Sequence, residues 1–129
     1  MSHDLTDRVI LITGAAGGLG RSAARHLARC GAVVGVSDIN AKGCDETAAM
    51  IRDAGGQAHS FPADLSSRDS FLAVADSLAR AAGRIDAVVN NAALLVYEKI
   101  EDVREETVDL MIGIGLKAPM WGAQALLAH

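Results

Sequence analysis

The chain has 129 residues, the usual length of one domain, so we expect residues 1–129 to form a single unit. Half of the residues are hydrophobic, and 12 basic against 16 acidic residues give a net charge of −4, which offers no positive field to nucleic acid or anionic lipid. The apolar runs are too short for a signal peptide or a membrane span, and the 2 cysteines lack zinc or redox spacing. The sequence therefore predicts a soluble, cytoplasmic protein without a metal site.

Short apolar runs alternate with stretches of helical periodicity along the chain. In chain order, the expected elements are a strand at Val9–Thr13, a helix at Leu19–Arg29, a strand at Ala32–Ser37, a helix at Ala41–Ala54, a strand at Ala58–Phe61, a helix from a capping box at Ser66–Asp69 to Ala82, a strand at Ile85–Val89, and a helical region from about Asp102 to the end. Pro119 is expected to mark a break or a new first turn in that last region. Such alternation is typical of a parallel sheet with helices on both faces, so we predict an α/β fold.

Four glycines follow the first predicted strand and indicate a loop that holds phosphate: Gly14, Gly17, Gly18 and Gly20. A P-loop is disfavoured because Ala15 and Arg21 stand where its first glycine and its lysine would be. A GxGxxG/A fingerprint read from Gly18 would start four residues too late after the strand.

The frame that fits best is Thr13-Gly14-x-x-x-Gly18-x-Gly20. In this frame Gly14 makes the turn off the strand, Gly18 lets the backbone approach a pyrophosphate, and Gly20 allows close packing of helix on strand. The free N–H groups of the helix N-terminus would then face the anion. For the loop by itself, a plain strand-to-helix turn remains the alternative.

Asp38 supplies a second indication of a dinucleotide. It ends the second predicted strand, 18 residues after Gly20, close to the spacing of about 20 for an acid that accepts from a ribose 2′-OH. A carboxylate there binds the ribose diol and repels a 2′-phosphate, and the next basic residue along the chain is Lys42. The sequence therefore predicts NAD as the cofactor. For Asp38 alone, helix capping is the alternative.

Three segments that follow predicted strands, "TGAAGGLG", "ADLSS" and "NNAA", together resemble the cofactor-binding half of a short-chain dehydrogenase/reductase, over Arg8 to about Leu127. The resemblance implies a Rossmann-like doubly wound parallel sheet of four strands in the order 3-2-1-4, flanked by helices and truncated before a fifth strand. It also implies a set of cofactor-binding residues: Gly14, Gly18, Leu19, Gly20, Asp38, Asp64, Leu65, Asn91, Ala92 and Ala93.

The resemblance also implies roles for some of these residues. Asp64 and Leu65 would flank the adenine ring, Asn91 and Ala92 would line a ribose, and Asn90 would brace the sheet. The family has glycine where this chain has Ala93, so we expect Ala93 to follow a backbone path that alanine disfavours.

The chain departs from the family's catalytic pattern. The stretch "IGLKA" puts Gly115 where the family has an asparagine, no serine follows Ser77, and the single tyrosine, Tyr97, is followed four residues later by Glu101 instead of lysine. The family's Ser and Tyr-x-x-x-Lys are thus missing from this chain, and we assign no catalytic residue. His26 and His59 are expected to be ordinary surface or packing residues.

The leading hypothesis is an NAD-dependent oxidoreductase of the short-chain type, which exchanges hydride with an unidentified alcohol or carbonyl substrate. Two alternatives are a catalytically silent NAD-binding half-domain that acts by association, and a fragment of a longer enzyme. We also expect a homo-oligomer through strand four or the last helices, because an apolar edge strand is rarely left bare.

Overall fold

The computed structural model of the chain describes residues 3–129. The order of its elements is β1 (Val9–Thr13), α1 (Gly18–Arg29), β2 (Val33–Ser37), α2 (Ala41–Asp53), β3 (Gln57–Ser60), α3 (Arg68–Ala82), β4 (Ala87–Val89), a 3₁₀ turn (Ile100–Asp102), α4 (Glu105–Ile112), a π-helical segment (Gly113–Lys117) and α5 (Ala118–Ala128). Every strand and helix that the sequence predicts is present, with ends that differ by at most three residues.

The four strands form one parallel sheet in the order β3-β2-β1-β4, which confirms the predicted topology. Gly35 lies in the middle of β2 beside Leu11 of β1. A Cβ atom at Gly35 would come within 2.6 Å of a methyl group of Leu78, so the missing side chain lets α3 pack close to the sheet.

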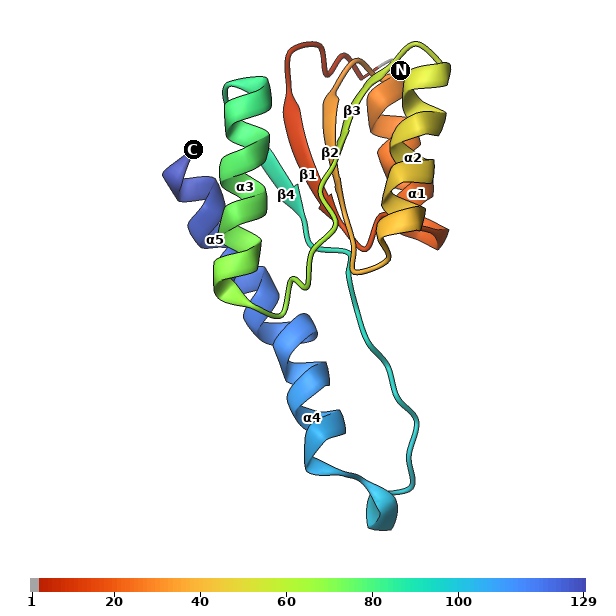
Figure 1. Cartoon of the computed structure of the whole chain (residues 1–129), viewed down its shortest axis with the longest axis vertical. Coiled ribbons are helices and arrows are strands. Elements are labelled where there is room, and N and C mark those ends of the chain that lie inside the picture. The colour runs from red at the N-terminus through yellow and green to blue at the C-terminus, as the bar shows by residue number, and fades with distance from the viewer. Residues whose placement is uncertain (1–2) are drawn as a thin grey trace.

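Helices cover both faces of the sheet, with α1 and α2 on one side and α3 and α5 on the other (Figure 1). Alternate residues of β1 serve the two layers: Ile10 and Ile12 belong to the α1–α2 cluster, while Val9 and Leu11 belong to the α3–α5 cluster. Alanines on α1, such as Ala24 and Ala28, are buried and keep that helix close to the strands. Two thin apolar layers around one sheet are the expected result of a core with few aromatic residues.

The start of α3 differs from the sequence prediction by one residue. The Ser67 hydroxyl accepts the Ser70 backbone N–H at 3.3 Å and is the N-cap, whereas the predicted capping box began at Ser66. Ser66 instead binds Asp64: its hydroxyl and its backbone N–H both donate to Asp64 Oδ1, at 2.6 and 3.1 Å. The correct cap lies one residue later because Asp64 holds Ser66 in the preceding turn.

The C-terminal region is one continuous helical rod, Glu105–Ala128, with a π-helical segment in its middle. The Ala118 N–H donates to the Gly113 carbonyl, and Pro119 stands in the first turn of α5, where the rod continues from the π-helical segment without the break that the sequence allowed. This rod is long and apolar enough to cross a membrane by length and composition, which corrects the expectation that no stretch approaches a span. In the fold, α5 packs against α3 and β4. The α4 part extends below the sheet as an arm (Figure 1).

Candidate functional site

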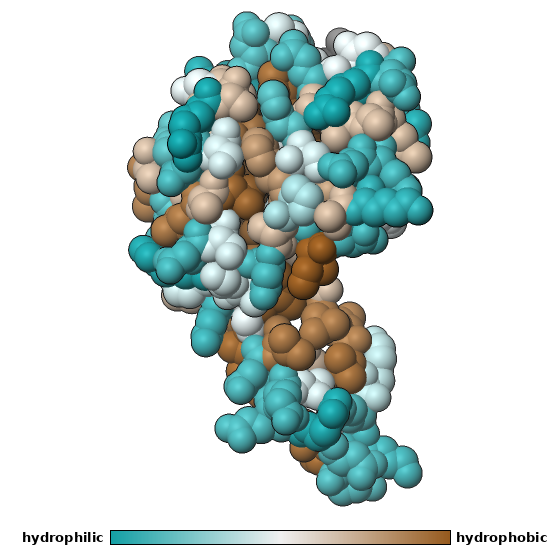
Figure 2. Space-filling model, in the orientation of Figure 1, coloured by the Kyte–Doolittle hydropathy of each residue, from teal (hydrophilic) through white to brown (hydrophobic). Residues whose placement is uncertain are grey.

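A pocket of about 470 Å³ opens at the carboxyl ends of the four strands. Its walls come from the segments that follow β1, β2, β3 and β4, and from the arm: Gly14, Asp38, Ile39, Ala63, Asp64, Leu65, Ser66, Asn91, Ala92, Ala93, Leu94, Leu110 and Ile114. This is the edge of an open parallel sheet at which ligands bind. Figure 2 shows apolar surface beside this junction of the body and the arm.

The glycine loop makes its turn through two residues with left-handed backbone, Gly14 at φ 66° and Gly18 at φ 52°. A Cβ atom at Gly14 would lie 2.8 Å from the Ala92 Cα, so only glycine lets this turn touch the segment after β4. Gly20 is equally constrained, because its Cβ would lie 2.1 Å from the Gly14 carbonyl oxygen. Gly17 and Gly18 face open space on the other side of the loop.

Helix α1 starts at this loop without a side-chain cap. Gly17 is its N-cap and carries no side chain, and the first turn of α1 contains no acidic residue. The first N–H groups of a helix lack partners inside the helix, and they carry the positive end of its dipole. The start of α1 can therefore bind an anionic group beside the pocket.

Asn91 ties the segment after β4 to β1 and to the glycine loop. Its side-chain amide donates to the carbonyls of Thr13 and Gly14, both at 3.2 Å, and its backbone N–H donates to Thr13 Oγ1 at 3.0 Å. The bracing role predicted for Asn90 therefore belongs to Asn91, which also lines the pocket. Asn90 is exposed, and its side chain lies where a Cβ at Gly122 would meet it.

Asp38 stands just after β2, half-buried in the pocket wall. Its Oδ2 accepts the Ala16 backbone N–H at 3.2 Å, and its Oδ1 accepts the Asn40 N–H at 3.0 Å. These bonds fix the carboxylate between the glycine loop and the start of α2. The adjacent Cys44 is buried, and burial together with the charge of Asp38 raises the pKa of its thiol to about 11, so this cysteine stays a neutral packing residue.

Seven of the ten predicted cofactor residues line the pocket: Gly14, Asp38, Asp64, Leu65, Asn91, Ala92 and Ala93. Gly18, Leu19 and Gly20 lie at the start of α1, outside the pocket lining, and Leu19 is exposed. Ala93 does not take the strained path that its place in the family pattern predicted. Within residues 3–129, Asp7 is the only non-glycine residue with a positive φ.

Sequence reasoning missed six lining residues: Ile39, Ala63, Ser66, Leu94, Leu110 and Ile114. Four of them, Ile39, Ala63, Ser66 and Leu94, are next in sequence to predicted residues. They lie in the segments that follow predicted strands, and this position could have indicated them. Leu110 and Ile114 come from the α4 arm and the π-helical segment, far along the chain, and no local signal marks them.

Tyr97, His26 and His59 do not line the pocket. Tyr97 is 91% exposed on the segment that leads to the arm, and it does not line the pocket. His59 stacks on Phe61 with ring centroids 6.2 Å apart, and His26 is exposed on α1 next to Cys30. No group of three or more His, Cys, Asp or Glu side chains placed to hold a metal ion occurs among residues 3–129.

A sequence profile of the family described as short chain dehydrogenase matches residues 8–129. Epidermal retinol dehydrogenase 2 of Homo sapiens is 34% identical over 125 residues, which are 96% of this chain and 40% of that protein. Cyclopentanol dehydrogenase of Comamonas sp. (strain NCIMB 9872) is 32% identical over 95% of this chain and 49% of that protein. The crystal structure of a metagenomic short-chain oxidoreductase in complex with NADP is 31% identical, with a TM-score of 0.89 over 95% of this chain and 56% of that one. The chain thus spans about half the length of these relatives.

Proposed function

Because the chain belongs to the short-chain dehydrogenase family, we propose that it is the NAD-binding part of an oxidoreductase that exchanges hydride with an alcohol or carbonyl substrate. The observation that carries the proposal is the pocket at the strand ends, with the Asp38 carboxylate in its wall. The bound nicotinamide would supply the hydride chemistry, and the residues of this chain would bind and orient the dinucleotide.

The residues present fit such a ligand. The uncapped start of α1 supplies N–H donors for a pyrophosphate, and Gly17 and Gly18 leave open space above them. Leu65, Leu110 and Ile114 are apolar lining residues against which an adenine ring would pack, and Asp64 lines the pocket next to Leu65. Ala92 and Ala93, in the segment after β4, line the side of the pocket where the nicotinamide end would lie.

The charges of the pocket support NAD over NADP. Among the described residues, two pocket-lining side chains are acidic, Asp38 and Asp64, and none is Lys or Arg. A 2′-phosphate would meet the Asp38 carboxylate without a cation in the lining to offset the repulsion. A ribose diol would instead donate hydrogen bonds to that carboxylate.

The proposal is tested by calorimetric titration of the chain with NADH and NADPH. We expect saturable NADH binding that is at least about tenfold tighter than NADPH binding, because charge-assisted hydrogen bonds contribute about 1.5–3 kcal/mol. Asp38→Ala should weaken NADH binding much more than NADPH binding, because it removes both the diol acceptor and the repulsion. Asp45→Ala is the matched control, since Asp45 is exposed on α2 and is absent from the pocket lining. Equal losses of affinity for NADH and NADPH in Asp38→Ala would contradict the proposal.

A further inference from the structure

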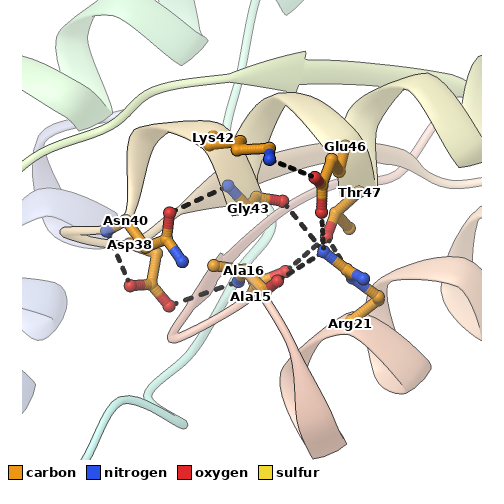
Figure 3. A network of polar contacts seen from close by, with 9 residues as sticks. All are labelled: Ala15, Ala16, Arg21, Asp38, Asn40, Lys42, Gly43, Glu46 and Thr47. Atoms are coloured by element: carbon orange, nitrogen blue, oxygen red, sulfur yellow. Dashed lines mark hydrogen bonds and ion pairs between the residues drawn. The ribbon is translucent and has the colours of Figure 1, made fainter.

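Arg21 occupies the first turn of α1, directly after the glycine loop, and its guanidinium reaches across to α2 (Figure 3). Nη2 donates to the Ala16 carbonyl at 2.6 Å and to the Gly43 carbonyl at 3.3 Å, and it pairs with Glu46 Oε2 at 3.1 Å. Nε donates to Thr47 Oγ1 at 2.9 Å. Four acceptors from two parts of the chain therefore meet one guanidinium, whose side chain is 24% exposed.

Thr47 continues this set of contacts into the core. Its side chain is fully buried on α2, and its hydroxyl donates to the Ala15 carbonyl at 2.8 Å while it accepts from Arg21. The carbonyls of two successive loop residues, Ala15 and Ala16, are thus held by side chains that meet at α2. We call Arg21, Thr47 and these two carbonyls the loop clamp.

The loop clamp reaches the pocket through Ala16. The Ala16 carbonyl accepts from Arg21, while the Ala16 N–H donates to Asp38 Oδ2 at 3.2 Å (Figure 3). A Cβ at Gly43 would lie 2.6 Å from the Ala16 Cβ, so α2 packs directly against this residue. A shift of Ala16 would therefore move the hydrogen-bond donor that orients the Asp38 carboxylate.

We propose that Arg21 is a positioning residue for cofactor recognition: through Ala16 it fixes the geometry of the Asp38 carboxylate, and so sets the preference between a ribose diol and a 2′-phosphate without touching either. This inference rests on the proposed function. The guanidinium serves here because its planar fork donates from Nε and Nη2 in two directions, to Thr47 and to Ala16. A lysine ammonium is a single point of charge and cannot span the same acceptors.

The test compares Arg21→Met, Arg21→Lys and the control Arg25→Met by calorimetric titration with NADH and NADPH. Arg25 is exposed one turn further along α1. We expect Arg21→Met to weaken NADH binding by about tenfold and NADPH binding by less, so that the ratio of the two affinities moves toward one. Arg21→Lys should resemble Arg21→Met, and Arg25→Met should leave both affinities and their ratio unchanged.

A purely structural role for Arg21 would lower the melting temperature and leave the affinity ratio of the folded protein unchanged, and that result would overturn the inference. Thr47→Val is the second variant, because it keeps the side-chain volume while it removes the hydroxyl bond to Ala15. Thr47→Val should move the ratio of the NADH and NADPH affinities toward one, as Arg21→Met does. Thr47→Ser keeps the hydroxyl and should retain the wild-type ratio.

Amide hydrogen exchange at Ala16, measured without any dinucleotide, separates this inference from the proposed function. Arg21→Met should speed exchange at Ala16 relative to wild type and to Arg25→Met, because the loop loses its anchor on α2. If the wild-type chain binds neither dinucleotide, the proposed function and the specificity role of Arg21 both fail, and unchanged exchange at Ala16 would overturn the clamp itself.

Discussion

At the scale of single residues, Gly17 and Gly20 lie three positions apart where the glycine loop enters α1, and they have opposite surroundings. A Cβ at Gly20 would lie 2.1 Å from the Gly14 oxygen and 2.7 Å from the Asn91 amide, while a Cβ at Gly17 meets nothing within 4 Å. The backbone of Gly17 is extended, with φ −170°, a conformation open to any residue. Gly20 is therefore required by packing, and Gly17 is not.

This contrast predicts that Gly20→Ala lowers the free energy of unfolding by about 2–3 kcal/mol, because an added methyl group must displace backbone atoms. Gly17→Ala should cost less, about 0.5–1 kcal/mol, because nothing obstructs the methyl group and the loss comes only from alanine being a poorer N-cap than glycine. Urea denaturation followed by circular dichroism measures both values. Similar losses of stability in the two variants would mean that the close approach of α1 to Gly14 and Asn91 does not require a glycine at position 20.

At the scale of one element, the cap of α3 distinguishes two neighbouring serines. Ser67→Ala removes the acceptor for the Ser70 N–H and should lower the free energy of unfolding by about 1 kcal/mol. Ser66→Ala removes an exposed hydroxyl bond to Asp64 and should cost clearly less, since the Ser66 N–H bond to Asp64 remains. The two variants are compared by chemical denaturation. A larger loss of stability in Ser66→Ala than in Ser67→Ala would support Ser66 as the N-cap, as the sequence predicted.

The elements show where sequence reasoning succeeds and where it stops. β1, β2 and β4 were predictable because their sequences are continuous apolar runs, whereas β3, with the sequence QAHS, was predicted from its place in the alternation. The ends of the first helices were marked by glycines such as Gly31 and Gly55, both with positive φ. The cap of α3 was misplaced because two adjacent serines satisfy the same local pattern, and only the bond from Ser66 to Asp64 decides between them. The π-helical segment Gly113–Lys117 was not predicted, because periodicity does not distinguish it from a continuous α-helix.

At the scale of the whole molecule, the position of the site was predictable and its outer wall was not. Asp38, Asp64 and Asn91 each follow a strand, and the carboxyl ends of parallel strands meet at one edge, so their convergence follows from topology. Leu110 and Ile114 reach the pocket because the α4 arm returns beside it, a long-range arrangement that no local motif encodes. The bracing asparagine was misassigned because Asn90 and Asn91 are equivalent in sequence and point to different neighbours in the fold.

Apolar surface on the C-terminal helices predicts self-association of the whole chain. Leu116 is 61% and Met120 is 56% exposed, and β4 is one of the two edge strands of the described sheet. Exposed apolar patches of this kind mark protein interfaces. We expect light scattering at micromolar concentration to give a mass above that of the monomer, and Leu116→Glu combined with Met120→Glu to reduce it. A monodisperse wild-type monomer would contradict this expectation. An unchanged mass in the double variant would place the contact away from Leu116 and Met120.

The walls of the pocket are drawn from four successive connections of the chain and from the arm, between Gly14 and Ile114. A ligand that contacts all of them would hold these connections together non-covalently. The pocket exists only in the folded chain, so such a ligand binds the folded state alone. By mass action, a ligand at one hundred times its dissociation constant would add about 2.7 kcal/mol to the free energy of unfolding. The supply of dinucleotide would then set what fraction of the copies is folded, as well as how many copies are loaded.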